Sequence, residues 1–107
     1  MQELRTWAER SKFQYSGSIE KGTKIEFGNC NRIFISGDKY KQLLNHFNGR
    51  TVNIGTSRTD PPIGSAGEWL MENVTKAAIA SYVGSILIHE RYAEKAGGPD
   101  IRFFSNI

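Results

Sequence analysis

The segment GTSRTDPPIGSAGEWL, residues 55–70, carries the strongest structural signal in this 107-residue chain. Its first half is a polar loop that ends in two prolines, and Pro61 holds the residue before it in an extended conformation. Its second half has Ser65 followed three residues later by Glu68, which is the pattern of a capping box at a helix start. The segment therefore predicts a rigid loop that leads into a helix.

The apolar pattern after this cap predicts helix to about Glu94, either as one long helix or as two with a break near residues 73–75. From Ala77 to Ile88 the chain is apolar on almost every side, so this part requires burial on several sides. A second subunit would supply part of that cover. The sequence thus favours a homodimer joined through Ala77–Ile88 or through the Phe103 and Phe104 segment.

The residues before the loop predict a sheet. Alternating apolar residues between Phe13 and Phe27, with Gly22 at the turn, predict a hairpin. The dense apolar run Arg32–Ile35 predicts a central strand buried on both faces, and residues 50–55 predict a fourth strand. A right-handed crossover would make strands three and four parallel, and an antiparallel arrangement stays open.

Two further helices are predicted in the same half. Gln2–Glu9 has apolar residues at helical spacing, with Trp7 as an anchor. The second helix begins after the N-cap Ser36 and ends at Asn48 and Gly49. We therefore expect one compact α+β domain over residues 1–107: a small, mainly antiparallel sheet of four to five strands, an inserted helix, and a long apolar C-terminal helix packed on one face.

The charge of the chain is modestly basic and uneven. The formal net charge is +3, and up to Pro62 there are ten Lys and Arg residues against six Asp and Glu. This balance permits contact with nucleic acid, but it is also common among proteins that never bind nucleic acid, and an ordinary solvated surface is the favoured reading. The polar face of the second helix, with Lys39 and Lys41, is a further basic surface. It too could contact nucleic acid or be an ordinary solvated helix face.

The composition excludes several classes of protein. Cys30 is the single cysteine, so no internal disulfide forms, and no residues at metal-ligand spacing surround it. We expect no metal and no cofactor. The first twelve residues lack the apolar core of a secretory signal, and Ala77–Ile88 is too short to span a bilayer. The sequence therefore predicts a cytoplasmic protein without a membrane segment.

The loop supplies the candidate site. Helix N-termini attract anions through free amides, and hydroxyl groups with an arginine would complete such a pocket. The candidate ligand-binding residues are Thr56, Ser57, Arg58, Thr59, Asp60 and Ser65. Against this reading, Glu68 already places a carboxylate in the first helical turn, and no phosphate-loop pattern is present. The structural alternative pairs Arg58 with Asp60 or with another carboxylate.

Two functions from different classes follow. The first is a small non-enzymatic binding protein that recognises an anionic ligand or nucleic acid through residues 56–60 and the basic N-terminal half. The second is a small enzyme or ligand-binding domain with a polar cleft built from Arg58, Asp60, Glu68 and either His46 or His89. His89 and Glu90 are adjacent, but neighbours on a helix point in different directions.

Residues Ile79–Gly84 resemble the helix-turn portion of a helix-turn-helix unit, in which an alanine precedes the turn glycine by four positions. The resemblance covers six residues. It then fails, because Glu90 stands where the unit needs an apolar residue. The motif therefore predicts nothing further about DNA binding.

Overall fold

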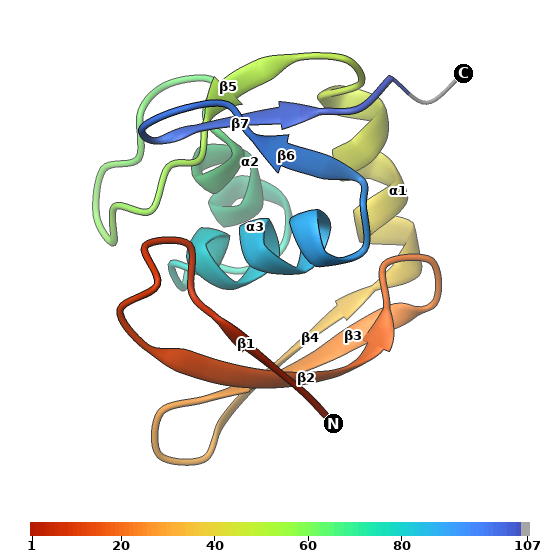
Figure 1. Cartoon of the computed structure of the whole chain (residues 1–107), viewed down its shortest axis with the longest axis vertical. Helices are drawn as coiled ribbons and strands as arrows, with labels where there is room; N and C mark the ends of the chain where they lie inside the picture. The colour runs from red at the N-terminus through yellow and green to blue at the C-terminus, as the bar shows by residue number, and fades with distance from the viewer. Residues whose placement is uncertain (106–107) are drawn as a thin grey trace.

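The computed structural model describes residues 1–105, and two antiparallel sheets enclose a central helix (Figure 1). The first sheet contains, in spatial order, β1 (Gln2–Arg5), β2 (Lys12–Ser18), β3 (Gly22–Phe27) and β4 (Asn31–Ser36). The second contains β5 (Thr51–Asn53), β7 (Asp100–Phe103) and β6 (Ala93–Lys95). The helices are α1 (Gly37–His46), α2 (Ala66–Asn73) and α3 (Ala80–His89). The predicted α+β class is confirmed.

The hydrophobic core lies between the sheets, with α3 in the middle (Figure 1). Val83, Ile86 and Leu87 of α3 are at most 1% exposed. Phe103, from the central strand of the second sheet, is also 1% exposed. The apolar residues that favoured a homodimer are thus largely covered within one chain, and the oligomeric state stays a prediction.

Several predicted elements are confirmed. The β2–β3 hairpin is present, and Gly22 begins β3 directly after the turn with a φ of +107°, which glycine adopts at little cost. Helix α1 begins after Ser36, whose Oγ accepts a hydrogen bond from the amide of Lys39 at 3.2 Å. Of the two alternatives for the C-terminal helical region, the broken one is present, because α2 ends at Asn73 and α3 begins at Ala80.

The predicted helix over Gln2–Glu9 is wrong. Residues Gln2–Arg5 form strand β1, paired in antiparallel register with β2 from Lys12 to Tyr15. Pairing with a neighbouring strand satisfies the backbone here and outweighs a local spacing pattern that is short enough to fit either structure. Trp7 does anchor the chain, since it is only 7% exposed.

The predicted arrangement of the strands is also wrong in two respects. β4 is an edge strand rather than a central one, and its Phe34 is 75% exposed. β5 belongs to a different sheet, where it pairs antiparallel with β7 from Thr51 to Asn53, so no parallel crossover exists between β4 and β5. One sheet of four to five strands is therefore replaced by separate sheets of four and three strands.

The single long apolar C-terminal helix is not present. α3 ends at His89, and Arg91 adopts a left-handed φ of +67° that turns the chain into β6. Ala93 then pairs with Phe103. Gly84, the turn residue of the helix-turn-helix resemblance, lies inside α3, where a Cβ would come within 2.9 Å of the Trp7 ring.

Candidate functional site

Residues 56–64 form a loop whose two ends are held together by backbone contact. The amide of Gly67 donates to the carbonyl of Ile54 at 2.8 Å. A Cβ at Gly67 would overlap the carbonyl oxygen of Gly55, and Gly55 itself has a φ of +71°. Both positions thus need glycine. This contact explains physically why the segment forms a defined loop.

Ser65 has a structural role at the base of this loop. Its Oγ accepts from the amide of Glu68 at 3.1 Å, as the capping pattern predicts. A full capping box would have the Glu68 carboxylate accept from the amide of Ser65. It accepts instead from the amide of Gly64 at 2.9 Å, and the amide of Ser65 donates to the carbonyl of Pro62. Ser65 is 1% exposed, so it caps α2 and offers no free face to a ligand.

The five loop residues Thr56 to Asp60 are all exposed. Ser57 orders the turn, since its Oγ accepts from the amides of Thr59 at 3.4 Å and Asp60 at 3.0 Å. The alternative pairing of Arg58 with Asp60 is absent: within residues 1–105 the ion pairs do not include Arg58. The guanidinium of Arg58 is therefore available to a ligand.

Arg58 lines a cleft of about 600 Å³, which we call the basic cleft. Its lining comes from five separate parts of the chain and contains three cationic side chains and no carboxylate. The residues are Ser11, Lys12, Phe27, Gly28, Asn31, Arg58, Lys76, Ala77, Ala78 and Tyr82. The cleft is thus a concave surface with a net positive charge.

The three cations reach the cleft from different elements. Lys12 is the first residue of β2, and Lys76 lies in the connection between α2 and α3. Lys12 also approaches Glu3 at 3.7 Å, but both side chains are more than half exposed, so this pair contributes little. Lys76, like Arg58, takes part in no ion pair within residues 1–105.

Two stacked aromatic rings also line the cleft. Phe27 and Tyr82 lie with their ring centroids 4.6 Å apart and their planes 25° from parallel. Phe13 packs edge-on against Tyr82 at 5.1 Å. Burial raises the pKa of Tyr82, and the positive charge of Arg58 acts in the opposite direction. Arg58 is therefore close enough to the phenol to act on it electrostatically.

The residues of the predicted enzyme-like cleft do not share this lining. Of that set, only Arg58 lines the basic cleft. His46 lies against the rings of Phe47, at 4.6 Å, and Trp69, at 6.3 Å. His89 contacts Tyr15, with ring centroids 6.4 Å apart. The two histidines are thus engaged with aromatic neighbours and do not join Arg58.

Four important lining residues were missed from the sequence: Lys12, Phe27, Lys76 and Tyr82. The excess of basic residues in the first half was a signal for Lys12, although it did not distinguish this lysine from the others. No local pattern pointed to Lys76, which lines the same cleft as Arg58 only because of the path of the connection after α2.

In the described part of the chain, residues 1–105, no three His, Cys, Asp or Glu side chains are grouped closely enough to hold a metal ion. Across the same residues, each helix is too short or too polar to cross a bilayer.

No protein-family model matches the sequence, and neither a curated protein nor a solved structure matches it significantly.

Proposed function

We propose that this chain is a small non-enzymatic binding protein whose basic cleft holds a nucleic-acid strand. The observation that supports the proposal is the position of Arg58, which shares a cleft with Lys12 and Lys76 and has no carboxylate partner within residues 1–105. Three cations from separate elements could each contact one of several successive phosphates. Such contacts attract and position a strand without reading its sequence.

The aromatic residues favour a single strand over an isolated anion. Phe27 and Tyr82 are only partly buried, so apolar ring surface is present beside the cations. Unpaired bases pack on such rings, while a basic groove follows the backbone. Inorganic phosphate would use the cations alone and would gain nothing from the rings.

Binding of labelled single-stranded RNA and DNA oligonucleotides, measured by fluorescence anisotropy at two salt concentrations, tests the proposal. Three neutralised phosphates predict a log–log salt slope of about −2, so raising salt from about 50 to about 200 mM should weaken binding about twentyfold. Arg58→Ala and Lys76→Ala should each weaken binding about tenfold and reduce the slope by nearly one unit.

Lys39→Ala provides the matched control, because Lys39 lies on α1 and does not line the basic cleft. In Figure 1, α1 lies on the opposite side of the molecule from the loop that carries Arg58. This variant should bind as the wild type does. The proposal fails if binding is absent, if it ignores salt, or if all three variants lose affinity equally.

The homodimer and the cytoplasmic location expected from the sequence remain part of the proposal. Because Val83, Ile86 and Leu87 of α3 are covered within the chain, a dimer would use the partly buried side chains of that region or the Phe103 and Phe104 segment. Sedimentation velocity at micromolar concentration distinguishes a monomer from a dimer. A monomer at that concentration removes the dimer from the proposal.

A further inference from the structure

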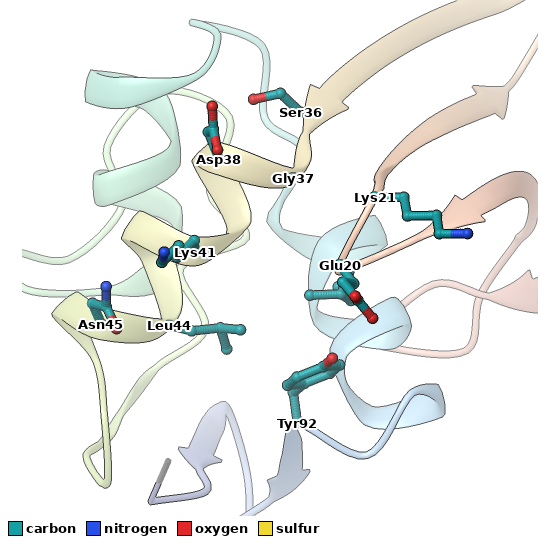
Figure 2. A pocket seen from close by; sticks show the side chains of 10 residues that line it. Glu20, Lys21, Ser36, Gly37, Asp38, Lys41, Leu44, Asn45 and Tyr92 are labelled. Carbon is teal, nitrogen blue, oxygen red and sulfur yellow. The ribbon is translucent and has the colours of Figure 1, made fainter. Parts of the chain in front are cut away.

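A second cleft, also about 600 Å³, lies between the β2–β3 turn and α1 (Figure 2). We call it the turn–helix cleft. Its lining combines apolar, acidic and basic side chains: Ile19, Glu20, Lys21, Ser36, Gly37, Asp38, Lys41, Leu44, Asn45 and Tyr92. This mixture differs from the basic cleft, which contains no carboxylate.

One end of the turn–helix cleft is held rigidly. A Cβ at Gly37 would overlap the backbone carbonyl of Glu20, so the first residue of α1 packs directly on the β2–β3 turn. The amide of Lys21 donates to Ser18 Oγ at 3.1 Å and orders that turn. The two walls are therefore fixed relative to one another, which lowers the cost of ordering a bound ligand.

The floor of the cleft is apolar, and each wall carries both signs of charge. Glu20 and Lys21 lie on the turn, and Asp38 and Lys41 lie on α1. Figure 2 shows the side chains of Leu44 and Tyr92 directed into the space between α1 and the turn, with Glu20 beside Tyr92. Lys41 lies on the α1 side. Within residues 1–105, neither Glu20 nor Lys41 takes part in an ion pair. Each charge is therefore open to a ligand.

The geometry points to a small zwitterion with an apolar side chain, such as a free aliphatic amino acid, as the occupant of the turn–helix cleft. Glu20 would receive its ammonium group, Lys41 its carboxylate, and Leu44 with Tyr92 its side chain. A cleft of this volume with a few placed polar groups over an apolar floor is the usual form of a small-molecule site. This inference is independent of the basic cleft.

Leucine and two derivatives test the assignment, because leucinamide lacks the carboxylate and N-acetyl-leucine lacks the ammonium group. Amide shifts of residues 19–21 and 36–45 in ¹⁵N-labelled protein report binding. Leucine should give saturable shifts at millimolar concentration, and each derivative should bind about three- to fivefold more weakly, as the loss of one exposed ion pair predicts.

Variants identify which side chain binds which charged group of the ligand. Lys41→Gln should lower the affinity for leucine and leave the affinity for leucinamide unchanged. Glu20→Gln should lower the affinity for leucine and leave the affinity for N-acetyl-leucine unchanged. Lys39→Gln is the matched control on the same helix and should have no effect, since Lys39 does not line the cleft. The inference is overturned if leucine gives no saturable shift up to its solubility limit, or if either derivative binds as tightly as leucine.

Discussion

The hydroxyl of Tyr15 donates a hydrogen bond of 2.8 Å to the carboxylate of Glu90, a residue 75 positions away in sequence. The other carboxylate oxygen of Glu90 accepts from the backbone amide of Ile19 at 2.9 Å. Glu90 therefore fastens the C-terminal end of α3 to strand β2 and to the residue that follows it.

Glu90→Ala should destabilise the protein by about 2–4 kcal/mol, because it leaves the Ile19 amide and the Tyr15 hydroxyl without their partner. Glu90→Gln keeps an acceptor and should cost about 1 kcal/mol. Urea unfolding measures both. Glu94→Ala is the control, since Glu94 belongs to an exposed pair with Arg102 and should cost less than about 1 kcal/mol. Equal losses for Glu90→Ala and Glu94→Ala would contradict the role of Glu90.

Alkaline pH should weaken the fold through three tyrosines. Burial raises the pKa of Tyr15, Tyr40 and Tyr82, and the hydrogen bond to Glu90 raises that of Tyr15 further. Unfolded tyrosines ionise near a pKa of about 10, so these three contribute stability that is complete below about pH 9 and is lost as the pH rises above about 10.

The free energy of unfolding, measured by urea titration across that range, should therefore fall on the alkaline side. Absorbance of tyrosinate should appear in step with unfolding for the buried phenols. The prediction is contradicted if the free energy of unfolding stays constant into strongly alkaline solution while all tyrosines ionise in the folded protein.

Arg58→Ala should raise the pKa of Tyr82 further, because the Arg58 charge is the influence that lowers it. Arg58→Lys retains the positive charge and should leave the Tyr82 titration closer to that of the wild type. NMR of ¹³C-labelled tyrosine measures the titration. If the Tyr82 titration is identical in both variants and in the wild type, Arg58 does not face the basic cleft in solution.

Gly67→Ala should cost about 1–3 kcal/mol, because its methyl group would force the chain apart at the carbonyl of Gly55. Gly64→Ala is the matched control in the same loop. Gly64 has a φ of +82° but open space around its Cβ position, so only the backbone cost of about 1 kcal/mol applies. Thermal or urea unfolding compares the two, and a larger loss at Gly64 would contradict the close approach.

The sequence predicted best where one short segment determines its own structure. The Ser36 cap with α1, the β2–β3 hairpin at Gly22 and the Ser65 cap all depend on residues a few positions apart. Prediction from the sequence failed where pairing with a strand elsewhere in the chain determines the secondary structure. Gln2–Arg5 is a strand because β2 is beside it, and Ala93–Lys95 is a strand because β7 is beside it.

The candidate site was likewise predictable only for residues within one short segment. Arg58 was identified from the loop that carries it, and the structure places it in a cleft. Its partners Lys12 and Lys76 come from other elements, and only the folded arrangement brings them together. Ser65 caps α2 and is buried, and its sequence signature did not distinguish this capping role from ligand binding, because a capping hydroxyl and a binding hydroxyl occur in the same pattern.

The contact between Gly55 and Gly67 has an evolutionary consequence. Because it fixes both ends of the intervening residues, their number and chemistry can change without disturbing the core, and the entropic cost of extra length grows only logarithmically. Residues 56–64 can thus acquire new side chains beside the cleft while the scaffold stays the same. Related chains with divergent specificity should differ here first and retain the two glycines.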